Sequence, residues 1–213
     1  MYVEREYGYE EACFDAQTNV QTIFYNRERD PVNHWPLDLD PSVPSTVVTM
    51  FRDPYLRARS VFMYASQKDL RPIQGTDPNM TFAEYVRLRN MKNCQTAMLT
   101  SKKGCYHFGK NNPNITMAKD LIRQPNFFFG ITERWDETLC LFHHWFGGEV
   151  QTYELKNNRK TTANSRYKVY HHMLDNVTRE TMPRDLDTLL FEDAEKVFDA
   201  RLRDAGCLNW APM

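Results

Sequence analysis

Several side chains that bind anions crowd one short stretch of the chain, RDPYLRARS, which runs from Arg52 to Ser60. A guanidinium group forms forked hydrogen bonds to a phosphate, and a serine hydroxyl adds one more. Arg52 is followed by Asp53 and Pro54, residue types that favour the N-cap and the first position of a helix. Because a helix N-terminus carries free amide groups and a partial positive charge, the stretch predicts a site for a small anion.

The segment before this stretch predicts where the site lies in the fold. Thr46–Phe51 is apolar and rich in β-branched residues, without polar alternation. Such segments form central strands of parallel sheets, covered on both faces. Arg52 would then stand at the carboxyl end of a strand, where α/β proteins bind ligands. Ser60 would lie roughly 9 Å along a helix that runs from Pro54 to about Gln67, at 1.5 Å per residue. The alternative is an ordinary helix start whose arginines are solvated.

The composition indicates a globular protein without a global electrostatic preference. The chain has 213 residues, 41% of them hydrophobic, which suffices for one large domain with a core. Its 27 basic and 28 acidic residues leave a net charge of −1, which disfavours nucleic acid or an anionic membrane as a partner. No apolar run is long enough for a transmembrane helix, and the N-terminal residues are too charged for a secretory signal.

The cysteines and sequons give information on the cellular compartment of the protein and do not predict a metal site. None of the five cysteines belongs to a CxxC pair, and no Cys/His cluster has zinc spacing, so no metal site is expected. Cys94 and Cys105 bracket a segment that would form a disulfide loop in an oxidising compartment; free buried thiols are the alternative. Asn-x-Thr sequons at Asn79, Asn114 and Asn176 are candidate N-glycosylation sites of a secretory-pathway protein.

The rest of the chain alternates strands with helices. Val20–Tyr25 is a predicted strand within an otherwise irregular N-terminal segment, residues 1–44. Asn126–Thr132 and Val150–Leu155 are predicted as further strands. Further helices are predicted over residues 81–99, 116–123, 133–146 and 183–205. The alternation predicts an α/β domain over residues 45–206, with a parallel sheet flanked by helices, and a tail at residues 207–213.

Several motifs in order resemble one enzyme family. The pattern R-D-P-x-x-R-x-x-S resembles the 3′-phosphate-binding motif of sulfotransferases that use PAPS, 3′-phosphoadenosine 5′-phosphosulfate. The segment FFFGITERWDETLCLFHHWFG looks like the strand–helix pair of the Golgi carbohydrate sulfotransferases. NCQTAML and LLFEDAEKVFDARL are similar to two other segments of that group, and NNRKTTAN (residues 157–164) to its basic loop over the nucleotide. The resemblance covers roughly residues 45–205 and is nearest to the heparan sulfate and uronyl 2-O-sulfotransferases.

The resemblance implies a P-loop-like sulfotransferase fold and transfer of a sulfuryl group from PAPS to a glycan hydroxyl, without a metal. Arg52 and Ser60 would hold the 3′-phosphate, and Arg159 and Lys160 would contact the same phosphate or the adenosine side. Arg57 is expected to form a structural ion pair. A glycosaminoglycan or other sulfated polysaccharide is a candidate acceptor, and a basic groove would suit it. Lysines that are candidates for lining such a groove are Lys102, Lys103, Lys110 and Lys119.

Two parts of the family pattern are absent. The family has a glycine- and lysine-rich loop for the 5′-phosphosulfate, but the only glycine before Arg52 is Gly8, and the first lysine is Lys68. The N-terminal part of the fold is therefore expected to be incomplete. The family also places a catalytic histidine about twenty residues before the motif arginine, and His34 is the candidate base here. Trp135, along with His143 and His144, is expected to be structural.

Three functions follow from these observations. The first is a PAPS-dependent sulfotransferase of the Golgi lumen; its relatives are type II membrane glycoproteins, held by an anchor not found in this chain. The second is a catalytically inactive nucleotide-binding or scaffold protein of the same fold, favoured by the missing loop. The third, a phosphoryl-transfer enzyme, would need a glycine-rich phosphate loop and acidic metal ligands, and neither pattern is found in the sequence.

Overall fold

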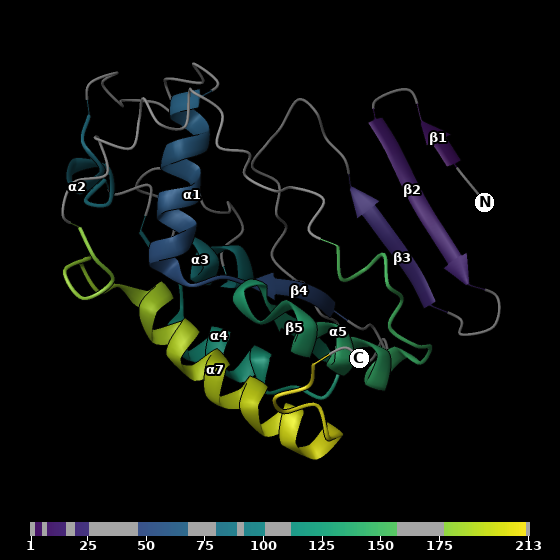
Figure 1. Ribbon diagram of the computed structural model, residues 1–213. Helices are drawn as coiled ribbons and strands as arrows, with labels where there is room; N and C mark the ends of the chain where they lie inside the picture. Colours follow the sequence, from purple (N-terminus) through teal and green to yellow (C-terminus); the bar gives the residue numbers. More distant parts are fainter. Residues whose placement is uncertain are drawn as a thin grey trace. The chain divides into compact units, whose positions relative to one another are not determined.

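The computed structural model describes residues 3–5, 8–15, 20–25, 47–67, 80–88, 92–100, 112–156 and 177–211 (Figure 1). For residues 3–5, 8–15, 20–25 and 64–67 only the backbone is described. The chain divides into two compact units, Met1–His34 and Trp35–Met213. The predicted domain boundary at residues 44 and 45 lies outside the described residues.

The first unit contains a three-stranded antiparallel sheet in the order β1-β2-β3. Its strands are β1 (Val3–Arg5), β2 (Gly8–Asp15) and β3 (Val20–Tyr25). The structure confirms the predicted strand Val20–Tyr25. It differs from the prediction of an otherwise irregular segment, because short connections bring successive segments into antiparallel pairing even where hydrophobic alternation is weak.

The second unit is built on a parallel pair of strands, β4 (Val47–Phe51) and β5 (Phe127–Ile131). All five residues of β5 are buried. Helices flank this small sheet, so the predicted α/β class is confirmed. The helical elements are α1 (Pro54–Gln67), α2 (Phe82–Tyr85), α3 (Cys94–Thr100), α4 (Ile115–Ile122), the 3₁₀ turn η2 (Thr132–Arg134), α5 (Trp135–Phe146) and α7 (Leu186–Ala205).

Successive side chains of β5 point to opposite faces and pack on different helices. The Phe128 ring packs edge-on against three aromatic rings of α5, with centroids 5.3–5.5 Å away. The neighbouring Phe129 ring lies 6.0 Å from Phe198 of α7. A Cβ on Gly130 would stand 2.1 Å from Thr138 of α5, so a glycine is needed where this helix approaches the strand. α5 and α7 thus cover opposite faces of β5.

Three sequence predictions of secondary structure need correction. β4 is not covered on both faces, because Val48 is 55% exposed and Met50 is 41% exposed on the face where α5 lies over β5. The predicted helix at residues 81–99 is divided into α2 and α3, because Asn93 adopts a left-handed φ of 58° directly before α3. The predicted strand Val150–Leu155 is wrong: residues 152–155 form a turn in which the Gln151 amide donates to the Glu154 carboxylate.

A disulfide between Cys140 and Cys207 joins α5 to the turn after α7. No local pattern in the sequence predicts this disulfide, since 67 residues separate the two cysteines. Cys94 is also disulfide-bonded. Its predicted partner, Cys105, lies outside the described residues. Of the helices in the described ranges, none combines the length and the apolar character needed to cross a bilayer.

Candidate functional site

Arg52 lies at the carboxyl end of β4, and two distant side chains hold it in place. The Gln95 side chain accepts from the Arg52 amide and donates to the Arg52 carbonyl, both at 2.9 Å. Glu133, directly after β5, accepts from Arg52 Nε at 3.1 Å and from the Asp53 amide at 3.2 Å. The Arg52 side chain is 37% exposed, and its two Nη groups have no partner among the described residues. Glu133 therefore fixes one edge of the guanidinium fork, and the other edge has no partner in the part of the chain that the structure describes.

The N-terminus of α1 offers less to an anion than the sequence indicated. Asp53 caps the helix, because its Oδ1 accepts from the Leu56 amide at 2.9 Å. Pro54 has no amide hydrogen. Arg179 pairs through Nε with Asp53 Oδ2 at 3.1 Å, and its own side chain is 61% exposed. Among the described residues, an anion at this position would therefore meet the guanidinium groups of Arg52 and Arg179. It would find few free backbone amides at the start of α1.

The other residues of the motif divide between surface and interior. Ser60 is exposed on α1, eight residues after Arg52. Arg57 forms the predicted structural ion pair: its Nη2 lies 3.3 Å from Oδ2 of Asp187, which is fully buried. The placement of Arg52 at a strand end and of Ser60 on the following helix agrees with the sequence prediction.

Asp187, in the first turn of α7, connects the site to the core. Its carboxylate accepts from the amides of Gln95 and Thr96 at 3.0 and 2.8 Å, and from the Thr96 hydroxyl at 2.9 Å. Since Gln95 in turn holds the backbone of Arg52, Asp187 positions the arginine through α3. Sequence reasoning missed these roles of Gln95 and Asp187. The only signal for Gln95 was its place in NCQTAML, one of the segments that carry the family resemblance.

Several predicted site residues lie outside the described residues. They are His34, Arg159, Lys160, Cys105, Asn79, Asn176, Lys102, Lys103 and Lys110. Lys119 lies on α4, and its ammonium is 3.7 Å from the carboxylate of Asp193. Asn114 is exposed and caps α4, with its Oδ1 accepting from the Met117 amide at 3.0 Å. His143, expected to be structural, bridges Glu154 and the carbonyl of Gly147.

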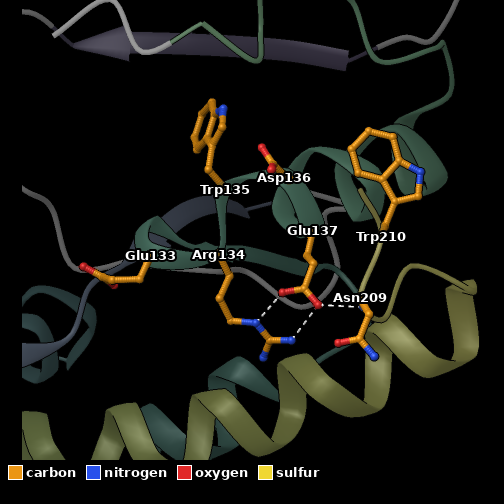
Figure 2. Close-up of a pocket in the computed structure, with 7 residues that line it drawn as sticks. All are labelled: Glu133, Arg134, Trp135, Asp136, Glu137, Asn209 and Trp210. Atoms are coloured by element: carbon orange, nitrogen blue, oxygen red, sulfur yellow. Dashed lines mark hydrogen bonds and ion pairs between the residues drawn. The ribbon is translucent and has the colours of Figure 1, made fainter. Parts of the chain in front are cut away.

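Arg134 of η2 and Glu137 of α5 belong to a second charged cluster (Figure 2). Arg134 donates through two nitrogens to Glu137 and through a third to Asp199. Hydrogen bonds from Arg134 and from the Asn209 amide stabilise the Glu137 carboxylate and hold its pKa below the ordinary value of 4.5. The Arg134 pKa is raised, chiefly by the hydrogen bond to Glu137, so the pair is ionised at neutral pH.

The lowered pKa of Glu137 predicts an acid-dependent loss of stability. The ionised Glu137 carboxylate stabilises the folded state fully above pH 4.5. This stabilisation is lost as the pH falls toward the pKa that Glu137 has in the folded state. We expect the difference in melting temperature between the wild-type chain and Glu137→Gln to shrink as the pH falls through this range. Asp136→Asn is the control, because Asp136 is exposed without an ion pair in the described part of the chain. A difference for Glu137→Gln that stays constant from neutral to acidic pH would contradict the prediction.

Comparisons with protein-family models, with curated proteins and with solved structures yielded no match to this chain. Within the described ranges, no group of three or more His, Cys, Asp or Glu side chains is arranged to hold a metal ion.

Proposed function

We propose that this chain is a carbohydrate sulfotransferase, in which the α/β unit has the sulfotransferase fold and Arg52 binds the 3′-phosphate of PAPS. The observation that carries the proposal is the guanidinium fork of Arg52. It stands at the carboxyl end of a parallel strand, is fixed on one edge by Glu133, and has two Nη groups without a partner among the described residues. This is the arrangement that a forked contact to a phosphate requires.

The proposed reaction is an in-line transfer of a sulfuryl group. A glycan hydroxyl attacks the sulfur of PAPS, the bond from sulfur to the phosphate oxygen breaks, and PAP leaves. Positive groups stabilise the charge that builds on the leaving phosphate, as in phosphoryl transfer. In this proposal Arg52 and Ser60 hold the 3′-phosphate, Arg159 and Lys160 contact the nucleotide, and His34 takes the hydroxyl proton.

A Golgi-lumen location is part of the proposal, and two features support it. The Cys140–Cys207 disulfide is of the kind that persists in oxidising compartments. The sequon asparagine Asn114 is exposed, and its Oδ1 caps α4. Its Nδ2 has no partner in the described part of the chain, so a glycan attached there would leave the cap intact.

An inactive nucleotide-binding protein of the same fold is the second candidate. One observation favours it: the Asp53 and Glu133 carboxylates pair with the site arginines. Such a protein would bind PAP without transferring sulfate.

Incubation with ³⁵S-labelled PAPS and a panel of glycans separates the two candidates. We expect the wild-type chain to label a glycan, and Arg52→Ala to lose the labelling. Arg203→Ala is the matched control, since Arg203 is exposed in the last turn of α7 and should leave the labelling unchanged. PAP binding without label in any glycan would favour the inactive nucleotide-binding protein.

A further inference from the structure

A hollow of about 510 Å³ opens where the start of α5 meets the turn after α7. Its volume is in the range of sites for small molecules. Residues from η2, α5 and the C-terminal turn line it: Glu133, Arg134, Trp135, Asp136, Glu137, Asn209 and Trp210. Because Glu133 also pairs with Arg52, the hollow adjoins the proposed nucleotide site.

Some of the polar groups around the hollow are engaged within the protein, and others are available. Glu133, Arg134 and Glu137 are held by the bonds described above. In contrast, the Asp136 carboxylate and the Asn209 carboxamide have no partner within the described ranges, nor does the Trp210 indole N–H. These three offer both acceptors and donors of hydrogen bonds to a ligand.

Two indole rings lie at the hollow, one on each side of the Asp136 carboxylate: those of Trp135 and Trp210 (Figure 2). Trp135 is 43% exposed, although its Nε1 donates to the Glu154 carbonyl at 2.8 Å, so the ring is fixed while a large part of it faces solvent. The sequence predicts a structural role for Trp135 but does not predict that its ring is exposed.

The C-terminal wall of the hollow is also held in place. The Cys140–Cys207 disulfide ties the turn to α5, and the Asn209 amide donates to Glu137 at 2.9 Å. The Trp210 amide donates to the Cys207 carbonyl at 3.1 Å. A site that is formed before the ligand arrives loses less entropy on binding.

The chemistry of this lining fits a neutral sugar. The face of an indole ring carries negative charge density, which attracts the polarised C–H groups on the face of a pyranose. Hydroxyl groups need the mixture of donors and acceptors found here, whereas a cation needs acceptors alone. The lining holds three carboxylates and one arginine, so it disfavours a sulfated or carboxylated sugar.

We propose that the hollow binds an uncharged saccharide unit of the acceptor glycan. The inference rests on the proposed function, since it assigns to the acceptor a site beside the 3′-phosphate arginine. It replaces the expected lysine-lined groove for a polyanion with a tryptophan-lined site for a neutral sugar.

Calorimetric titration of the full chain with three probes tests this assignment: an N-acetyllactosamine tetrasaccharide, a heparin tetrasaccharide, and tetramethylammonium as a cation. We expect the neutral saccharide to bind with a Kd on the order of 0.1–1 mM. Trp210→Ala and Asp136→Asn should each weaken saccharide binding at least about tenfold, which is the effect of losing a contact worth about 1.4 kcal/mol. Met117→Ala and Asp120→Asn, at exposed residues of α4, are the matched controls. If Trp210→Ala proves unstable, Trp210→Phe takes its place. It keeps an aromatic face and should retain most of the affinity for the saccharide.

Binding of the heparin fragment alone or of the cation alone would overturn the assignment, as would no binding of the neutral saccharide by a folded chain. PAP is titrated into the same samples. If PAP binds and the saccharide does not, this inference fails while the proposed function stands. If the saccharide binds at the tryptophans and PAP does not, the hollow is a sugar site and the sulfotransferase proposal fails.

Discussion

Replacement of Asp187 by alanine is expected to lower the free energy of unfolding by about 3–5 kcal/mol, the usual cost of breaking a buried ion pair. The Asp187 side chain is fully buried, and it accepts hydrogen bonds from two backbone amides, a hydroxyl and a guanidinium group. Alanine would remove the carboxylate that pairs with Arg57, whose side chain is only 16% exposed. It would also leave the amides of Gln95 and Thr96 buried without their acceptor.

Thermal and urea unfolding measure this effect. The melting temperature should fall by about 6–20 °C, since each kcal/mol corresponds to about 2–4 °C in a chain of this size. Asp204→Ala is the control on the same helix, because Asp204 is exposed and should change stability little. If Asp187→Ala does not fold, Asp187→Asn retains one oxygen acceptor and should show a smaller loss. A change below about 1 kcal/mol for Asp187→Ala, within the range of ordinary surface substitutions, would contradict the assigned role.

Arg52→Ala is expected to weaken PAP binding by at least about thirtyfold, since losing one partner of a hydrogen-bonded charge pair costs about 2–5 kcal/mol. The physical reason is that the open edge of the Arg52 guanidinium supplies two charge-assisted donors. Arg52→Lys should recover only part of the affinity, because the lysine ammonium lacks the planar fork that offers two parallel N–H groups to the phosphate. Ser60→Ala should cost less, about 0.5–1.5 kcal/mol for a neutral hydrogen bond.

Isothermal calorimetry on folded variants gives these affinities, with Arg203→Ala as the charge-matched control. Equal affinity of the wild-type chain and Arg52→Ala for PAP would place the nucleotide elsewhere. Glu133→Gln distinguishes a residue that positions Arg52 from one that contacts the phosphate. It should weaken PAP binding less than Arg52→Ala does, because the Arg52 guanidinium is held less firmly but is still present.

The sequence predicted those parts of the site that short, local sequence patterns determine. An apolar segment, an Asp-Pro pair and a regular helix pattern place Arg52 at a strand end and Ser60 on α1. The parts that were missed depend on contacts between distant residues. Gln95 and Glu133 are 43 and 81 residues away from Arg52 along the chain, so no spacing rule connects them.

Similar long-range contacts explain the errors in secondary structure. Helical propensity alone favoured one helix over residues 81–99. In the structure the Asn93 amide donates to Asp185, and the Asn93 side chain accepts from the Leu186 amide. These bonds cap the N-terminus of α7 and hold Asn93 in a left-handed conformation that no continuous helix contains. The Cys140–Cys207 disulfide and the exposure of Trp135 likewise follow from tertiary packing.

Titration of the wild-type chain with PAP and with adenosine 5′-monophosphate tests whether Arg52 recognises a 3′-phosphate. The two nucleotides share the adenosine 5′-phosphate and differ by the 3′-phosphate. We expect PAP to bind in the micromolar range and the monophosphate to bind at least about tenfold more weakly, a difference of about 1.4 kcal/mol. Arg52→Ala should remove this difference. A folded chain that binds neither nucleotide, or both equally, would contradict this expectation.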